Sequence, residues 1–318
     1  MNRQVNTSSV TKVLFLTYFR SGSSLLAESV NKNPEAFYWF EPLMATYADL
    51  NIRHPFVMLQ NGSFGRLQRG LVQQLCEILV DVLNCKLRRL DDRTLGNNVL
   101  VYWQTMEALV PYKTCLIRNG AIQSIDPVVP KTTIDKCLPL AIDQCKKAKI
   151  RGVKTIRIAS YMVDKLVELD PEIKIIHSVR DPRGMLLSVM KIREALRDPE
   201  EIRQWVKMYC YRMHNDKEFM PKLKNKCDVL HLRYEDLVTG FNQSLHRIYS
   251  YMKRDVPPTV LRWFATNTHA AEDTGPMGTA RTNATAVAFK WRQYLPMDKK
   301  AIVKDVCSDV LRENRYLA

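Results

Sequence analysis

Residues 11–30 read TKVLFLTYFRSGSSLLAESV, and this stretch decides the fold. The run Thr11–Phe19 is apolar and rich in β-branched residues, which predicts a buried strand. The small polar turn Arg20–Ser24 follows, and Leu25–Val30 then continues at helical spacing until Asn33-Pro34 interrupts it. Strand, polar turn and helix in this order open a βαβ unit, so we expect an α/β fold with a parallel sheet.

Later segments continue the alternation of strands and helices. We predict helices over 64–90, 160–169, 185–188, 201–220 and 245–252, and strands over 99–103, 152–157, 173–179 and 229–234. No stretch is typical of a linker between domains. We therefore expect one α/β domain over 11–318, with a central parallel sheet and helices on both faces, and an N-terminal extension over 1–10.

The composition indicates an ordinary folded protein. Of the 318 residues, 46% are hydrophobic and 25% are charged, and these proportions exclude disorder, collagen and coiled coil as classes. The longest apolar runs fall far short of the ~20 residues that a membrane helix needs. We therefore expect a soluble chain with no signal peptide or anchor at Met1, while an anchor lost upstream stays open.

The net charge of +15 at pH 7 indicates attraction to a polyanion. Nucleic acid, anionic lipid, nucleotide phosphates and acidic glycans all fit this charge, and so does a basic surface that only keeps the protein soluble. The five Trp and 13 Tyr residues form no stripe on which bases could stack. We therefore do not expect nucleic-acid binding.

The eight cysteines leave the redox compartment open. None of them forms a CxxC pair, which disfavours a zinc ribbon or a thioredoxin motif. Buried thiols in a cytosolic protein and disulfides in a luminal protein both fit, and the sequence does not determine a pairing. Sequons of the N-x-[ST] type begin at Asn6, Asn61, Asn242 and Asn283, and they favour the luminal alternative.

The turn Arg20–Ser24 has the composition of an anion cradle. Backbone N–H groups in such a turn lie at the positive end of the dipole of the following helix. Arg20 adds a guanidinium that can donate twice, and Ser23 and Ser24 add hydroxyls. The Walker A pattern G-x-x-x-x-G-K-[ST] is absent, which disfavours a nucleoside triphosphatase. An ordinary helix capped by serine is the alternative.

A second anion site is predicted where the strand over 173–179 ends. Arg180 follows that strand directly, and Ser188 lies eight residues later in the predicted helix. Ligands of parallel sheets bind at the carboxyl ends of the strands, so both side chains can face one anion there. Two anion sites at two strand ends indicate a ligand with two separated phosphate groups.

These motifs resemble those of the sulfotransferases that use 3′-phosphoadenosine 5′-phosphosulfate (PAPS). Arg20–Ser24 resembles their 5′-phosphosulfate loop, and Val179–Arg183 with Ser188 resembles their 3′-phosphate site. Within the family, the sequence is most similar to Golgi carbohydrate sulfotransferases that act on the 6-hydroxyl of galactose, N-acetylgalactosamine or N-acetylglucosamine. Further motifs occur in the family's order, namely Asn33-Pro34, Phe37-Tyr38, Glu41-Pro42-Leu43, Arg233–Leu237, Arg281 and Trp291-Arg292.

The resemblance implies the residues that bind the cofactor. Arg20 and the backbone of Ser21, Gly22, Ser23 and Ser24 are expected to hold the 5′-phosphosulfate, and Arg180 with Ser188 the 3′-phosphate. Tyr234 is expected to line the nucleotide, while Arg281 and Lys290 are phosphate partners in a late loop that closes over it. We expect the sequon at Asn283 to be unused, because a glycan there would crowd the nucleotide.

The resemblance also implies the catalytic residues Glu41, Lys154 and Arg20. Glu41 lies 21 residues after Arg20, the offset at which the related tyrosylprotein sulfotransferases place a catalytic glutamate, so it is our candidate general base. Lys154, with Arg157 nearby, resembles a lysine that offsets charge on the transferring group. A surface or capping carboxylate and a solvated lysine are the alternatives. We expect no metal, and the six histidines have no spacing typical of a metal site or a triad.

The sequence thus predicts a carbohydrate sulfotransferase that transfers the sulfuryl group of PAPS to a sugar hydroxyl, with 3′-phosphoadenosine 5′-phosphate (PAP) as the product. We expect a glycosaminoglycan or glycoprotein glycan as the acceptor and the Golgi lumen as the location. A secreted or cytoplasmic location and a homodimer stay open. The alternative functions are protein-tyrosine sulfation and a catalytically silent glycan-binding protein with the same fold. The sugar and the sulfated position are not determined.

Overall fold

The computed structural model describes residues 10–97, 99–100, 106–120, 129–192, 196, 198–223 and 226–316. The chain divides into two compact units. Unit 1 consists of Met1–Leu16, Ser29–Ile175 and Asn225–Asp228. Unit 2 consists of Thr17–Glu28, Ile176–Lys224 and Val229–Ala318. The single domain expected over 11–318 and the extension over 1–10 stay predictions.

The strands are β1 (Thr11–Leu16), β2 (Ala36–Phe40), β3 (Phe56–Met58), β4 (Phe64–Arg66), β5 (Ile150–Thr155), β6 (Ile173–Val179) and β7 (Val229–Arg233). The first α-helices are α1 (Ser23–Asn31), α2 (Met44–Asp49), α3 (Arg69–Leu83), α4 (Asp92–Gly96), α5 (Val110–Arg118), α6 (Lys131–Lys147), α7 (Ser160–Leu169) and α8 (Pro182–Met190). The later ones are α9 (Pro199–Phe219), α10 (Tyr234–Thr239), α11 (Phe241–Tyr251), α12 (Pro258–Thr268), α13 (Ala284–Phe289), α14 (Trp291–Tyr294), α15 (Met297–Val306) and α16 (Ser308–Glu313). The 3-10 helices are η1 (Leu87–Arg89), η3 (Glu107–Leu109) and η4 (Met220–Leu223).

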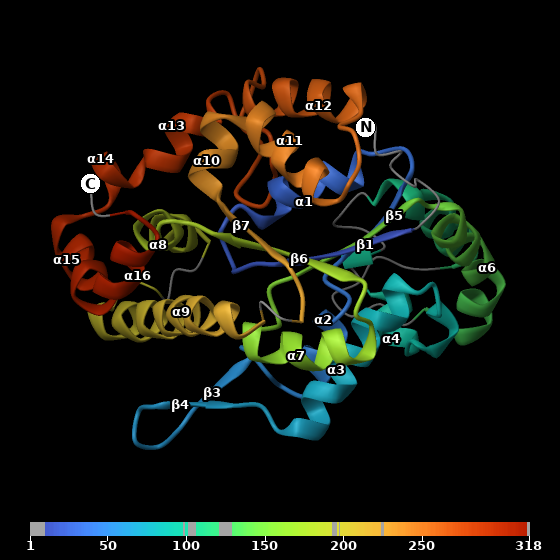
Figure 1. Cartoon of the computed structure of the whole chain (residues 1–318), viewed down its shortest axis with the longest axis horizontal. Helices are drawn as coiled ribbons and strands as arrows, with labels where there is room; N and C mark the ends of the chain where they lie inside the picture. The colour runs from blue at the N-terminus through green and yellow to red at the C-terminus, as the bar shows by residue number, and fades with distance from the viewer. Residues whose placement is uncertain are drawn as a thin grey trace, which may run out of the picture. The chain divides into compact units, whose positions relative to one another are not determined.

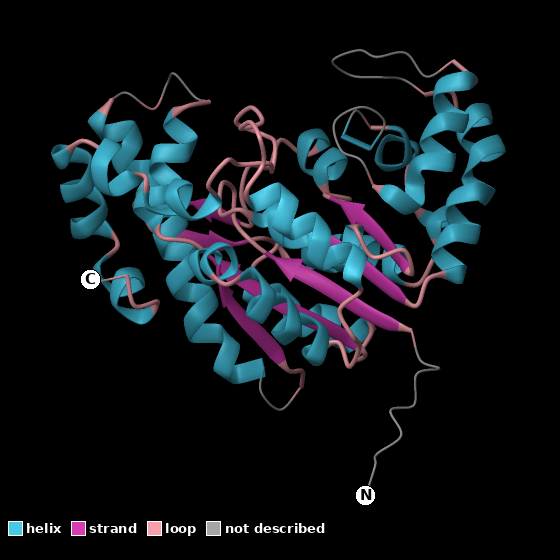
Figure 2. Cartoon of the chain, turned by 90° about the horizontal axis from the view of Figure 1, so that it is seen from above, coloured by secondary structure: helices cyan, strands magenta, loops and turns pink. Residues whose placement is uncertain are grey.

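Five strands form one sheet in the order β2-β5-β1-β6-β7. Figure 1 labels β1, β5, β6 and β7, and Figure 2 draws the strands in magenta. β5 pairs in parallel with β1 and with β2, so that Leu16 lies opposite Thr155 and Phe40 lies opposite Lys154. All residues of β1 are buried, as expected for a strand of a parallel sheet that is covered on both faces. The predicted α/β fold with a central parallel sheet is confirmed.

Helices of unit 1 pack their apolar faces against the strands and against each other. α3 contacts both β5 and α7, and α6 contacts β2. The buried residues Val72, Leu75, Cys76 and Leu79 of α3 recur at intervals of three and four, which places them on one helix face. These helices therefore cover the strands whose ends carry the candidate catalytic residues.

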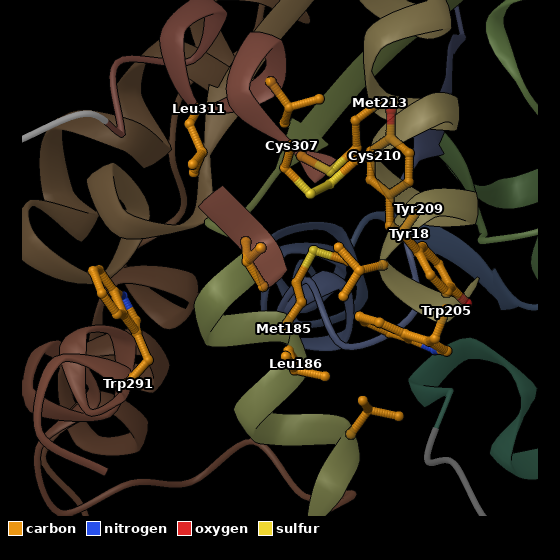
Figure 3. Close-up of a cluster of buried hydrophobic side chains, with 14 of the residues drawn as sticks. Tyr18, Met185, Leu186, Trp205, Tyr209, Cys210, Met213, Trp291, Cys307 and Leu311 are labelled. Carbon is orange, nitrogen blue, oxygen red and sulfur yellow. A yellow bond between two sulfur atoms is a disulfide. The ribbon is translucent and has the colours of Figure 1, made fainter. Parts of the chain in front are cut away.

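The core of unit 2 is built around α9. Both α8 and α15 contact α9, and the buried side chains of these helices form one hydrophobic cluster (Figure 3). Tyr18, which follows β1, and Trp291 belong to the same cluster. The disulfide between Cys210 and Cys307 lies within it and joins α9 to the residue after α15 (Figure 3).

The helix predicted over 64–90 is shorter than expected. Phe64–Arg66 forms a strand that pairs antiparallel with β3, and the turn between them contains Gly62 at a φ of 75°. The helix begins at Arg69 and ends at Leu83. Cys85 has a φ of 56°, and such a left-handed residue ends a helix.

Two other local predictions differ from the structure. A strand was expected over 99–103, but Val99 and Leu100 are helical and residues 101–103 lie outside the described residues. Tyr234 was expected at the end of a strand, but it begins α10. The neighbouring strand β7 ends one residue earlier, at Arg233.

Three disulfides join six of the eight cysteines. Besides Cys210–Cys307, they are Cys85–Cys145 and Cys115–Cys137. Cys76 and Cys227 are free thiols. The predicted disulfide bonding is confirmed. No helix among the described residues combines the length and the apolar character needed to cross a membrane.

Candidate active site

The turn after β1 has a strained backbone. The Ser21 N–H donates to the Tyr18 carbonyl oxygen at 3.2 Å, and Arg20 in this turn has a φ of 64°. The left-handed region costs a residue with a side chain about 1–2 kcal/mol. Gly22 has a φ of 78°, and a Cβ there would lie 2.1 Å from the Tyr234 ring. Glycine is therefore required at position 22, because any side chain would meet that ring.

The Arg20 guanidinium contacts two later segments of unit 2. Its Nε donates to Ser188 Oγ at 3.0 Å. Its Nη2 donates to the Pro276 carbonyl oxygen, and its Nη1 lies 3.2 Å from the Met277 sulfur. Two residues predicted for opposite ends of the ligand, Arg20 and Ser188, are therefore in direct contact.

Arg180 lies against the same turn and is 6% exposed. Its Nη1 donates to the Arg20 carbonyl oxygen at 3.1 Å, and its guanidinium carbon lies 4.5 Å from the centre of the Tyr234 ring. The Nε atom of Arg180 is buried and has no hydrogen-bond partner among the described residues. Arg180 is therefore held in place by the Arg20 carbonyl oxygen and the Tyr234 ring.

Positive charges accumulate around this turn. Burial first, and then the charges of Arg180 and Arg281, lower the pKa of Arg20 to about 10. Burial, followed by the charges of Lys290 and Arg281, also lowers the pKa of Lys191, which directly follows α8. Lys191 was not among the predicted site residues. Its position three residues after Ser188, on the same helix face, is the sequence signal that could have found it.

Arg281 and Lys290 differ in what they contact. Arg281 Nη1 donates to the Thr274 carbonyl oxygen at 3.0 Å and Nη2 donates to that of Gly278 at 2.9 Å. Arg281 therefore holds the loop whose Pro276 contacts Arg20. The exposed Lys290 lies between α13 and α14, with Nζ 5.0 Å from the centre of the Tyr294 ring.

The serines of the turn and the late sequon lie at helix starts. Ser21 is fully buried, while Ser23 and Ser24 form the first turn of α1 rather than the preceding loop. The first N–H groups of a helix have no partner within it, so this turn presents free donors. Asn283 is exposed and its side chain caps α13 by accepting from the Ala286 N–H at 2.8 Å.

Glu235 and Tyr316 fix the turn that follows β6. Glu235 accepts from the Asp181 N–H at 3.0 Å with one oxygen and from the Tyr316 hydroxyl at 3.1 Å with the other. Arg183 forms a two-point ion pair with Asp181, with Nε–Oδ1 and Nη2–Oδ2 distances of 2.9 and 2.7 Å. These contacts hold the backbone that carries Arg180.

In unit 1, Glu41 lies in a cage of donors at the carboxyl ends of β2 and β5. Its Oε1 accepts from Lys154 Nζ at 2.7 Å and from the Ile156 N–H at 3.0 Å. Its Oε2 accepts from Thr155 Oγ1 at 3.3 Å and from Arg157 Nη1. The Glu41 N–H extends the strand pairing by donating to the Lys154 carbonyl oxygen at 2.8 Å. The register of two parallel strands therefore brings Glu41 and Lys154 together.

The Glu41 carboxylate is ionised despite its burial. Its side chain is 3% exposed and that of Lys154 is 4% exposed, so neither is the solvated surface residue considered as an alternative. Burial by itself would raise the pKa of Glu41, but the charges of Lys154 and Arg157 outweigh it and lower the pKa below the ordinary value. Glu41 also has a φ of 52°. Such strain in a residue other than glycine is typical of functional sites.

The structure thus gathers the predicted residues into two groups. Unit 2 brings together Arg20, Arg180, Ser188 and Tyr234, and unit 1 brings together Glu41, Lys154 and Arg157. Over the described residues, no group of three or more His, Cys, Asp or Glu side chains is arranged to hold a metal ion.

A model of the sulfotransferase family matches residues 13–258. This range includes the Arg20 turn, Glu41, the Arg180 corner and Tyr234. The chain therefore belongs to the sulfotransferase family and is a sulfotransferase enzyme, as its motifs predicted.

The relatives found among curated proteins include carbohydrate sulfotransferases. Carbohydrate sulfotransferase 1 of Danio rerio is 26% identical over 98% of this chain and 79% of its own length. Carbohydrate sulfotransferase 1 of Homo sapiens is 28% identical over 98% of this chain and 80% of its own length. Among solved structures, a mouse sulfotransferase complexed with PAP aligns with a TM-score of 0.45 at 15% identity, covering 97% of this chain and 89% of that one.

Proposed function

We propose that this enzyme transfers the sulfuryl group of PAPS to a hydroxyl group of a glycan. The observation that carries the proposal is Arg180, a buried guanidinium whose Nε has no partner among the described residues. A buried donor without an acceptor costs about 1–3 kcal/mol, and more when the group is charged. An anionic oxygen bound at Arg180 removes this cost, which supports a phosphate site.

The residues around the Arg20 turn fit a nucleotide with two anionic ends. We assign Arg180 and Ser188 to the 3′-phosphate, and Arg20 with the backbone of Ser21–Ser24 to the 5′ end. Burial first, and then the charges of Arg180 and Arg281, lower the pKa of Arg20, and this concentration of positive charge supports a ligand of high negative charge. When bound, PAPS supplies the activated sulfuryl group. The acceptor hydroxyl has to be activated by the protein.

We assign that activation to Glu41 as the general base. A hydroxyl is a weak nucleophile, and a positioned base contributes about 10²–10⁴-fold to the rate. The lowered pKa keeps the Glu41 carboxylate ionised and able to accept the hydroxyl proton. Both Glu41 carboxylate oxygens already accept hydrogen bonds. One of the donors therefore has to move before the carboxylate can accept the proton of the acceptor hydroxyl. Arg157 is the donor best placed to move, since its side chain is 20% exposed and that of Lys154 only 4%.

Arg20 and Lys154 are assigned to electrostatic stabilisation. Sulfuryl transfer spreads negative charge over the transferring group and the leaving oxygen, as phosphoryl transfer does. Positive side chains fixed in advance stabilise such charge without reorganising. Lys154 is fixed by Glu41 and by the Phe40 ring, whose centre lies 4.5 Å from Nζ, and Arg20 is fixed by Ser188.

The names of the curated relatives support a carbohydrate as the acceptor. We assign the reaction to the 6-hydroxyl of galactose, N-acetylgalactosamine or N-acetylglucosamine in a glycosaminoglycan or glycoprotein glycan. The net charge of +15 supports an acidic glycan in particular. Protein-tyrosine sulfation is the alternative that an acceptor assay has to exclude.

We place the reaction in the Golgi lumen. Three disulfides support an oxidising compartment, and PAPS-dependent glycan sulfation takes place there in the enzymes that this chain resembles. A homodimer stays a prediction, which sedimentation of the purified protein tests directly.

An acceptor panel with radiolabelled PAPS tests the proposed function. Keratan sulfate, chondroitin and mucin-type glycans form one arm, and tyrosine-containing acidic peptides form the other. We expect label in at least one glycan and none in the peptides. Label confined to the peptides would contradict the glycan assignment, and binding of PAP without transfer to any acceptor would favour a silent binding protein.

A further inference from the structure

A chain of buried hydrogen bonds lies within unit 2 directly behind the Arg20 turn. Its members are Tyr18 from that turn, His177 from β6, His231 from β7, and Arg212 and Asp216 from α9. Tyr18, His177, Arg212 and Asp216 are each at most 1% exposed. None of the five takes part in the proposed reaction, and burial of several polar groups is costly unless each has a partner.

The hydrogen bonds of this chain have one possible direction. Tyr18 Oη donates to Asp216 Oδ2 at 2.7 Å, because a carboxylate only accepts. The Tyr18 oxygen is then free to accept from His177 Nε2, which lies 2.7 Å away. Burial lowers the pKa of both imidazoles, so both are neutral at pH 7. A neutral His177 that donates from Nε2 accepts at Nδ1 from His231 Nδ1, which lies 3.1 Å away, so each ring has one tautomer.

The same tyrosine determines the geometry of the turn through its backbone. Ser21 Oγ donates to the Tyr18 carbonyl oxygen at 2.7 Å and accepts from the Tyr18 N–H at 3.2 Å. The Ser21 N–H donates to the same carbonyl at 3.2 Å. Arg212 holds the preceding residue, since its Nη2 donates to the Thr17 carbonyl oxygen at 3.0 Å. The buried chain and the turn are thus joined at both Thr17 and Tyr18.

The turn needs such an attachment because Arg20 is strained. A residue other than glycine stays in the left-handed region only where its surroundings over-determine it. On one side, Arg180 Nη1 holds the Arg20 carbonyl oxygen. On the other side, Tyr18 is fixed by the rings and helices of the hydrophobic core, where it packs with Trp205 and Tyr209 (Figure 3), and by its hydroxyl.

We propose that Tyr18 and Asp216 are positioning residues that, through the Tyr18–Ser21 hydrogen bonds, hold the Arg20 turn in the conformation that binds the 5′ end of the nucleotide. Neither side chain touches the ligand. The proposal rests on the proposed function for the identity of the ligand, but the restraint on the turn is a property of the free protein. The identity of the ligand and the restraint on the turn can therefore be tested separately.

Tyr18→Phe is the decisive variant, since it removes the hydroxyl and keeps the ring. Hydrogen exchange by mass spectrometry on the full chain without ligand reports on the turn through a peptide covering 17–24. Calorimetry reports the affinity for PAP. We expect exchange in this peptide to become at least tenfold faster and the affinity for PAP to fall at least fivefold.

Tyr112→Phe is the matched control. Tyr112 is also fully buried, and its hydroxyl donates to the Leu95 carbonyl oxygen at 3.0 Å in unit 1. It should lose comparable stability and leave both readouts unchanged. Exchange in Tyr18→Phe equal to that of wild type or of the control would overturn the proposal. A wild type that does not bind PAP would refute the proposed function, and the exchange result would still decide the proposal.

Ser21→Ala covers the case in which Tyr18→Phe does not fold. It removes both hydrogen bonds of the Ser21 hydroxyl to the Tyr18 backbone. Faster exchange in the peptide covering 17–24 is the expected result, and unchanged exchange overturns the proposal. Affinity for PAP is not used with this variant, because Ser21 belongs to the binding loop.

Discussion

Arg180 Nη1 donates to the carbonyl oxygen of Arg20 at 3.1 Å, although the two arginines are 160 residues apart in the sequence. Burial lowers the pKa of Arg20, and the nearby charge of Arg180 lowers it further. Two like charges held side by side destabilise the free protein, and a bound anion reverses this effect. The arrangement therefore indicates a site that is organised for a polyanion before the ligand arrives.

Gly22→Ala should weaken nucleotide binding at least tenfold. The methyl group would have to occupy a left-handed residue and displace the Tyr234 ring, whose nearest atom lies 2.1 Å from the Cβ position. Titration with PAP measures the loss. Gly70→Ala is the control, because a Cβ there meets nothing within 4 Å. Equal affinity for PAP in Gly22→Ala and wild type would show that the turn does not form the site.

Lys191→Gln should weaken binding of PAP about three- to tenfold, or roughly 0.7–1.4 kcal/mol. Burial lowers the pKa of Lys191, and the charges of Lys290 and Arg281 lower it further, so Lys191 contributes to the same positive field. The loss should shrink as the salt concentration rises. Lys304→Gln removes an exposed lysine of α15 and should have no effect. A loss of the same size in both variants would mean that only the net charge matters.

Glu41→Gln should lower kcat by about 10²–10⁴-fold while the affinity for PAP changes less than twofold. Glutamine keeps the size of the side chain but cannot take up the acceptor proton. Glu35→Gln, at an exposed carboxylate that pairs with Lys149, is the control. Retained turnover in Glu41→Gln would remove Glu41 as the base. Loss of folding instead would indicate that Glu41 serves mainly to pair Lys154 and Arg157.

The stability of the protein should fall as the pH decreases from about 6.5 towards 4, in part because of His231. Burial first, and then the charge of Lys217, lower the pKa of His231 to about 4 in the folded state, while the unfolded chain has the ordinary value near 6.5. The unfolded state therefore takes up the proton first, so the contribution of neutral His231 is complete above pH 6.5 and is lost on acidification.

Urea unfolding at pH 7 and pH 5 measures this effect. His231→Gln, which cannot be protonated, should lose less stability between the two pH values than wild type does. An identical loss in both proteins would mean that His231 does not contribute to the acid sensitivity.

Local sequence signals were sufficient to predict the Arg20 turn with its flanking strand and helix, and the strand that precedes Arg180. The run 11–19 followed by a small polar turn predicted β1, the turn and α1, and the strand before Arg180 was predicted with its observed bounds, Ile173–Val179. Such predictions succeed because hydrophobic periodicity and turn composition depend only on residues that are close together in the sequence.

Pairs distant in the sequence could not be predicted in the same way. The contact between Glu41 and Lys154 depends on the register of β2 on β5, and that between Tyr18 and Asp216 spans 198 residues. Both depend on tertiary packing, about which local patterns carry no information. The start of the helix predicted over 64–90 was wrong for the same reason, because Phe64–Arg66 pairs with β3 in a hairpin.

Binding of PAP and of 5′-AMP to wild type and to Arg180→Ala tests the central claim most directly. The two nucleotides differ only in the 3′-phosphate, which we assign to Arg180 and Ser188. Wild type should prefer PAP strongly, and Arg180→Ala should lose about 10–100-fold in affinity for PAP while its affinity for 5′-AMP changes little. Undiminished affinity of Arg180→Ala for PAP would contradict the account.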